Sequence, residues 1–274
     1  MEIKKNESAE FEQYCETYKP LIEKGLRENL PVAPTHIETQ FKTALEYALF
    51  QGEMRLRPIL TLLGAELVEG KAEDVLSAAV AVEFVYASSL VFEDLFAKNE
   101  IRNGRESLHR KFGDDLAMLV GIGFLNAAYP LVFVNHSGMP ERAMTAHSEI
   151  VECVGAAGLV GGQTIEISLE TSVGGSKNQE LETESLRNLK TSAIIRLSLR
   201  LGAILSGANY MELANLSRFA ELLGDAYQMS DEFGDSNINL SSTVDEAKRV
   251  LIENFPSNEA RSCLIQLTES LIEK

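Results

Sequence analysis

Apolar side chains recur along most of the chain with the three- and four-residue spacing of helices, and the two-residue alternation of strands is missing. This pattern predicts an all-α fold. Proline, glycine and a T-x-x-E capping box at Thr35 and Glu38 mark where helices begin and end. The expected helices are residues 9–29, a segment opened by that capping box, residues 58–68, 75–92, 116–134, 140–158, 181–205 and 210–234, and a short pair after Ser241, with a polar loop at 171–179.

Two of these helices are apolar nearly all round. Residues 75–92 carry one charge, Glu83, and residues 116–134 are about as long as the ~20 residues that span a bilayer. The second stretch contains Asn126 and Pro130 and has no basic flank of the kind that fixes orientation in a membrane. We therefore expect the two helices to pack together in the middle of a bundle, and we do not expect an integral membrane protein.

Acidic residues close two apolar helices. Residues 75–92 run directly into Glu93 and Asp94, and a helix far downstream ends with Asp231 and Asp235, which are four residues apart and so share one helical face. Taken alone, such acids are more often a solvated helix end. Together, two acidic ends can hold divalent metal, and Mg²⁺ prefers carboxylates combined with the phosphate oxygens of a substrate.

Cationic side chains suited to phosphate occur in three short segments. Arginine binds phosphate through two parallel hydrogen bonds, whereas lysine acts as a point charge. Acidic metal ligands together with such cations indicate a diphosphate site, although each cation by itself is more often solvated or ion-paired. The candidates are Arg55 and Arg57, Arg102 and Arg105, and Lys190 with its neighbour Thr191.

Composition narrows the class of protein. The chain has 274 residues, 45% of them apolar, and no linker divides it, so a single domain over residues 1–274 is expected. A net charge of −16 disfavours nucleic acid and anionic membrane surfaces as partners. Three widely spaced cysteines and an N-terminus without an apolar core favour a cytoplasmic protein with reduced thiols.

Several segments, in order and spacing, resemble the trans-isoprenyl diphosphate synthases of the polyprenyl synthetase family. The likeness covers most of the chain, from about residue 52 to residue 235, and includes the second of the family's two Asp-rich motifs. The matching segments are residues 55–58 (R-L-R-P), Gly104 with residues 107–112, residues 161–163 (G-G-Q), residues 190–191 (K-T) and residues 227–235.

The resemblance implies a helical bundle of the isoprenoid-synthase type around a central cavity. It also implies Mg²⁺, an allylic prenyl diphosphate and isopentenyl diphosphate as ligands, and a homodimer, which a surplus of apolar helical surface also favours. Site residues carried over from the family are Lys190, Thr191 and Gln228 for catalysis, Arg55, Arg57, Arg102 and Lys190 for diphosphate, and Asp94, Asp231 and Asp235 for metal, with Glu93 and Glu232 as further candidates.

The first Asp-rich motif departs from the family. Where the family has D-D-x-x-D, this chain has a glutamate at Glu93, an aspartate at Asp94 and no carboxylate at Ala97. Lys98 follows Asp94 by four residues, the spacing at which an acid and a base pair on one helix. We expect the ammonium of Lys98 to replace part of the positive charge that Mg²⁺ supplies at this motif in the family. Further departures stand at Met54, Tyr86, Asn103 and Ile122.

Two functions from different classes follow. One is a short-to-medium chain trans-prenyltransferase that condenses isopentenyl diphosphate with an allylic diphosphate, with weakened turnover. The other is an inactive homologue that binds a prenyl diphosphate or serves as partner subunit of an active synthase. A less favoured third reading is another diphosphate-ionising reaction, such as cyclisation.

Product length depends on the cavity floor. In the family, a bulky residue four or five positions before the first motif closes that floor, and here those positions are Ser88 and Ser89. Both side chains are small, so we expect products of geranylgeranyl length or longer unless Phe84 or Phe124 blocks the floor from elsewhere.

Overall fold

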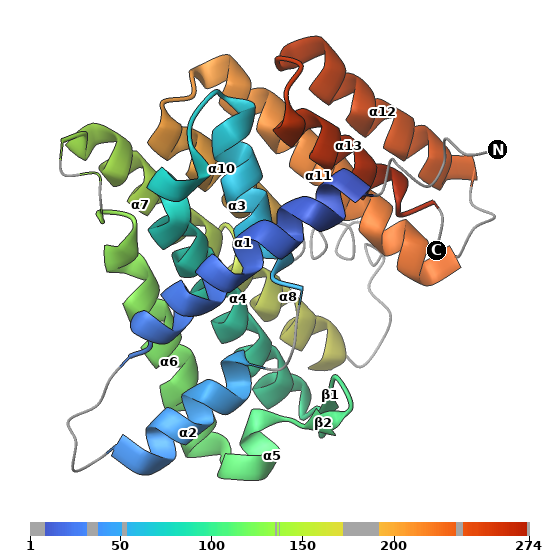
Figure 1. The fold of residues 1–274 in the computed structure, drawn as a ribbon. Coiled ribbons are helices and arrows are strands. Elements are labelled where there is room, and N and C mark those ends of the chain that lie inside the picture. Colours follow the sequence, from blue (N-terminus) through green and yellow to red (C-terminus); the bar gives the residue numbers. More distant parts are fainter. Residues whose placement is uncertain are drawn as a thin grey trace.

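The computed structural model describes residues 9–31, 38–50, 54–134, 136, 138–171, 192–233 and 238–272, and these residues confirm the all-α prediction (Figure 1). One short hairpin, β1 (Ile101–Arg102) with β2 (Arg105–Glu106), interrupts the helices. The helical segments are α1 (Ala9–Glu28), α2 (Glu38–Leu49), α3 (Leu56–Leu67), the 3₁₀ turn η1 (Ala72–Val75), α4 (Leu76–Ala97), α5 (Leu108–Phe112), α6 (Asp114–Leu131), α7 (Pro140–Val154), α8 (Leu159–Thr171), α10 (Ala193–Ser206), α11 (Tyr210–Phe233), α12 (Ile238–Asn254) and α13 (Glu259–Glu269).

Helix α4 runs through the middle of the bundle (Figure 1). It packs most extensively against α6, and the rings of Phe84 and Phe124 stack between them with centroids 5.6 Å apart. By length and composition Ala72–Ala97 would pass as a membrane span, but 67% of its most apolar window is buried inside the bundle. The predicted buried pair of apolar helices is therefore confirmed.

A second stretch, Pro140–Ser168, also has the length and composition of a membrane span, and only 22% of its apolar window is buried. This stretch was expected to begin with one helix over residues 140–158, and that prediction is wrong, because α7 ends at Val154 and α8 begins at Leu159. A Cβ atom at Gly158 would overlap the carbonyl oxygen of Cys153, so only glycine permits this sharp turn between the two helices.

The hairpin is an element that the periodicity did not predict. Its two central residues, Asn103 and Gly104, have φ values of 51° and 74°, as a type I′ turn requires. The Asn-Gly pair was the available signal, since this dipeptide favours such turns in two-residue hairpins. The turn places Arg102 opposite Arg105.

Glycine also sets the distance between α3 and α10. A Cβ at Gly202 would overlap the carbonyl oxygen of Thr61, and one at Gly64 would overlap the carbonyl oxygen of Leu199. The two helices therefore meet backbone to backbone, and no rotation of a side chain could make room for a Cβ atom there.

Replacing Gly202 with Ala is expected to lower the free energy of unfolding by about 1–3 kcal/mol, the usual cost of overpacking a close helix contact. Urea denaturation measures this change through the transition midpoint. Gly138→Ala is the matched control, because nothing lies within 4 Å of the added Cβ there. Equal stability of the two variants would contradict a backbone contact at Gly202.

Candidate functional site

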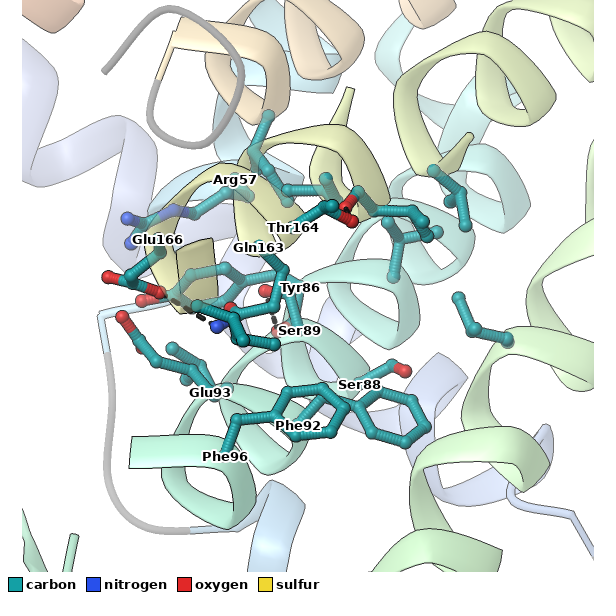
Figure 2. A pocket seen from close by; sticks show the side chains of 18 of the residues that line it. Arg57, Tyr86, Ser88, Ser89, Phe92, Glu93, Phe96, Gln163, Thr164 and Glu166 are labelled. Atoms are coloured by element: carbon teal, nitrogen blue, oxygen red, sulfur yellow. Dashed lines mark hydrogen bonds between the residues drawn. The ribbon is translucent and has the colours of Figure 1, made fainter. Parts of the chain in front are cut away.

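A cavity of about 770 Å³ opens beside the C-terminal half of α4. Its walls come from the start of α3, from α4 and α6, from Arg102 of β1, from the end of α7, from α8, and from α10 and α11, so segments far apart in the sequence meet there. More of its surface is apolar than polar, and the charged side chains of Arg57, Glu93 and Glu166 lie toward one side (Figure 2). Such a shape suits an amphiphilic ligand.

The polar side of the cavity carries one stacked cation. The guanidinium of Arg57 lies 3.9 Å from the centre of the Tyr86 ring, a cation–π contact that fixes its direction. Gln163 donates from Nε2 to Glu166 Oε2 at 2.8 Å, and Glu93 lies beside this pair (Figure 2). Gln228 of α11, predicted from the sequence, also lines the cavity. Arg57 and Gln228 are thus predicted site residues that the structure brings to one cavity.

The apolar side is narrowed by aromatic rings that the sequence reasoning missed. Phe92 and Phe96 both line the cavity, with ring centroids 6.1 Å apart (Figure 2). Their i, i+4 spacing could have predicted that both rings lie on the same face of one helix as Ser88 and Ser89. Phe84 and Phe124, the two rings expected as alternative blocks, are fully buried and do not line the cavity.

The two small residues that were expected at the cavity floor border the cavity. Ser88 and Ser89 both line the cavity, and their hydroxyl groups are used within the protein. Ser88 Oγ donates to the carbonyl oxygen of Gly121 at 2.9 Å, and Ser89 Oγ donates to that of Tyr86 at 2.8 Å. The first hydrogen bond joins α4 to α6 and the second lies within α4, and the side chains that border the cavity at both positions are small.

Arg102 occupies the first acidic motif. Its Nε donates to Asp94 Oδ2 at 2.7 Å, and its Nη2 donates to Asp94 Oδ1 at 2.7 Å and to Glu93 Oε2 at 2.8 Å. Burial alone would lower the pKa of the guanidinium, but the hydrogen bonds and charges of Asp94 and Glu93 outweigh it and raise that pKa above its ordinary value. A cation of the protein itself therefore sits where the family resemblance leads one to expect metal.

The predicted pairing of Lys98 with Asp94 is wrong. Lys98 Nζ lies 3.0 Å from Asp114 Oδ2. Besides Arg102, it is Asn99 that contacts Asp94, through a hydrogen bond of 3.1 Å from Asn99 Nδ2 to Asp94 Oδ1. The reason is local, because Lys98 has a φ of 54° and ends α4 in the left-handed conformation. The side chain thereby leaves the helical face on which i, i+4 pairs form.

Arg55 lies outside the cavity, against the expectation that it contacts a diphosphate. Its Nη1 lies 2.6 Å from Glu83 Oε1, its Nε 2.7 Å from Glu23 Oε1, and its Nη2 donates to the carbonyl oxygen of Leu49 at 2.8 Å. Arg55 and Glu83 are each only 2% exposed. The one charge of the apolar stretch 75–92 thus finds its partner here, and we assign Arg55 to the packing of α1, α3 and α4.

Magnesium does not fit the first motif in this arrangement. Both oxygens of Asp94 and one of Glu93 already accept hydrogen bonds from Arg102, and Ala97 supplies no oxygen. Within the described residues, no group of three His, Cys, Asp or Glu side chains could hold a metal ion. The expected metal site of the second motif stays a prediction, since the side chains of Asp231 and Glu232, and all of Lys190, Thr191 and Asp235, lie outside the described residues.

Similar proteins of known sequence include plant geranylgeranyl pyrophosphate synthases. Over 218 residues the chain is 34% identical to a chloroplastic geranylgeranyl pyrophosphate synthase of Capsicum annuum, covering 78% of this chain and 57% of that protein. It is 32% identical over 236 residues to the large subunit 1 of a heterodimeric geranylgeranyl pyrophosphate synthase of Arabidopsis thaliana, covering 83% of this chain and 62% of that one. The chain thus spans about six-tenths of the length of these relatives.

Solved structures share the whole fold. An FPP/GFPP synthase from Zymomonas mobilis, in its apo form, superimposes with a TM-score of 0.86 at 24% identity, covering 97% of this chain and 99% of that one. The sequence model of the polyprenyl synthetases matches residues 38–246, which include the cavity-lining parts of α3, α4, α6, α8, α10 and α11. On this match, the chain belongs to the polyprenyl synthetase family.

Proposed function

We propose that the chain condenses isopentenyl diphosphate with an allylic prenyl diphosphate, as a short-to-medium chain trans-prenyltransferase. The observation that carries the proposal is the division of the cavity, with the charged groups of Arg57, Glu93 and Glu166 toward one side and the rings of Phe92 and Phe96 on an apolar wall (Figure 2). A prenyl diphosphate has the same two parts. Synthases of geranylgeranyl pyrophosphate among the relatives support this choice of substrate class.

The proposed reaction breaks the bond between the allylic carbon and its diphosphate, forms a carbon–carbon bond to the alkene of isopentenyl diphosphate, and releases a proton. Arg57 binds oxygens of a diphosphate, and its stacking on Tyr86 keeps it oriented before the ligand arrives. The apolar lining takes up the prenyl chain and keeps water from the allylic cation. Mg²⁺, expected from the resemblance at Asp231 and Asp235, would stabilise the departing diphosphate.

The test is an incubation of the purified protein with Mg²⁺, isopentenyl diphosphate and allylic donors of increasing length, followed by product analysis. New prenyl diphosphates that depend on isopentenyl diphosphate are the expected result. A reaction without isopentenyl diphosphate serves as the control, and a cyclised hydrocarbon in that control would instead support the third reading. If no product forms, the proposal that the protein transfers prenyl groups without a partner is wrong.

A second candidate function is favoured by the first motif. Arg102 holds Glu93 and Asp94, and Ala97 lacks a carboxylate, which supports a protein that binds a prenyl diphosphate, or a partner subunit, without turnover of its own. The relative named as the large subunit of a heterodimeric synthase supports the idea of such an assembly. Activity that appears only after co-purification with an active homologue would select this function.

We further propose a dimer formed through α6 and α7. Met118, Leu119 and Ile122 share one face of α6 and are 45%, 56% and 52% exposed, and Met144 of α7 is 56% exposed, so both helices present large apolar side chains to solvent. The variant Leu119→Glu with Ile122→Glu is expected to convert the dimer to a monomer in light scattering. Ile252→Glu on α12, where the side chain is 54% exposed, should leave the dimer intact. A wild-type monomer at micromolar concentration would refute this interface.

Product length provides a separate prediction. Ser88→Phe is expected to shorten the products, because the ring would enter the cavity next to Phe92 and block the growing chain. Chromatography of the dephosphorylated products measures the length. Ser88→Ala is the matched control, since it removes the hydrogen bond to Gly121 without adding bulk. A wild-type enzyme that makes only farnesyl diphosphate, or a Phe variant with unchanged products, would contradict a floor at Ser88.

A further inference from the structure

The first acidic motif is already neutralised within the chain. Asp94 is 4% exposed, and both of its oxygens accept hydrogen bonds from Arg102, which also reaches Glu93. These are charge-assisted bonds of 2.7 to 2.8 Å, at the short end of the range for nitrogen and oxygen. A metal ion at this place would have to displace the guanidinium first.

The backbone builds this contact locally. Lys98 ends α4 in the left-handed conformation, and the chain changes direction there. The backbone N–H of Ser107 donates to the carbonyl oxygen of Glu100 at 2.9 Å and closes the hairpin. Arg102 therefore lies on a short, closed loop that begins at the same helix end as Asp94. Closing so short a loop costs little chain entropy, so the contact is favoured whenever the hairpin is formed.

The remaining ligands suit an arginine better than Mg²⁺. Mg²⁺ demands near-ideal octahedral geometry with oxygens at about 2.0–2.1 Å and is usually held by one or two carboxylates plus phosphate oxygens. Of the three positions of the motif, Ala97 has no carboxylate. The carboxylates of Glu93 and Asp94 both bind Arg102, whose guanidinium is a planar fork of donors. The second candidate cation, Lys98, is engaged with Asp114.

We propose that Arg102 is the resident cation of the first motif and takes the place of a divalent metal ion there. This half of the cavity then presents an arginine to the ligand, and divalent metal binds elsewhere in the site. The inference rests on the proposed function only for the nature of the ligand, a diphosphate. It does not require turnover.

Direct metal binding tests the inference on the full chain. Mn²⁺ serves as the probe, its binding is followed by electron paramagnetic resonance with inorganic diphosphate present, and no reaction is needed. In the otherwise wild-type chain, Glu93→Gln should leave the number of bound Mn²⁺ ions and their affinity unchanged within about twofold. Glu93 is 34% exposed at its side chain, so this variant should fold. A tenfold or greater loss of Mn²⁺ affinity would overturn the proposal.

The converse variant removes the resident cation. Arg102→Gln is expected to gain an additional Mn²⁺ site, or at least a tenfold higher affinity, and adding Glu93→Gln in that background should abolish the gain. Arg105→Gln, the opposite position of the same hairpin, is the matched control and should behave as wild type. An Arg102→Gln protein that melts like wild type but gains no Mn²⁺ would overturn the proposal. Failure of the condensation assay, by contrast, leaves these binding results unaffected.

Discussion

Replacing Arg55 with Met is expected to lower the free energy of unfolding by about 3–5 kcal/mol, the cost of leaving one partner of a buried ion pair alone. The carboxylate that loses its cation is Glu83, which is 2% exposed in the middle of the bundle. Methionine fills a similar volume, and at a φ of 61° it meets the same backbone constraint as arginine. The change therefore isolates the loss of charge and hydrogen bonds.

Urea denaturation of the Arg55 variant measures this loss. Arg105→Met is the matched control, an exposed arginine whose removal should change stability by no more than about 0.5 kcal/mol. The double variant Arg55→Met with Glu83→Leu should recover a large part of the loss, because no buried charge is then left unpaired. A decrease below about 1 kcal/mol in the single variant would contradict a buried pair.

Replacing Arg57 with Gln is expected to lower kcat/KM about 100- to 1000-fold, by analogy with the loss of one preorganised contact to developing charge, about 3–4 kcal/mol. Of the two described arginines that line the cavity, Arg102 is held by Asp94 and Glu93, whereas the guanidinium of Arg57 stacks on Tyr86. If the chain does not turn over unaided, the same variant should weaken binding of a prenyl diphosphate about 10- to 150-fold, the equivalent of about 1.5–3 kcal/mol for charged hydrogen bonds.

Arg57→Lys separates charge from geometry. Lysine keeps the positive charge but loses the planar fork and much of the stacking, so an intermediate loss is expected. Arg105→Gln, outside the cavity, should keep full activity and affinity. If Arg57→Gln stays within threefold of the wild type in both kcat/KM and binding, the diphosphate is bound by other residues.

The local pattern of side chains determined most of the helical architecture. The buried pair of α4 and α6 followed from two stretches that are apolar on every side, because such helices have no polar face to show to water. The family and the cavity residues Arg57, Gln228, Ser88 and Ser89 followed from short motifs, because their order and spacing are read directly from the chain. The hairpin could also have been predicted from the Asn-Gly pair, because the turn preference of this dipeptide is local.

Partners of charged groups were decided by the tertiary structure. The chain holds 41 acidic and 25 basic residues, so sequence spacing alone offers each cation many carboxylates. Lys98, in the left-handed conformation at the end of α4, decides the partners of two cations. Its own ammonium lies against Asp114, and the hairpin that follows it places Arg102 against Asp94. Arg55 met Glu83 only because α3 packs against α4, which brings together residues 28 positions apart. Ion pairs depend on distances of a few ångströms, and those distances are set when helices pack, after the local pattern has had its effect.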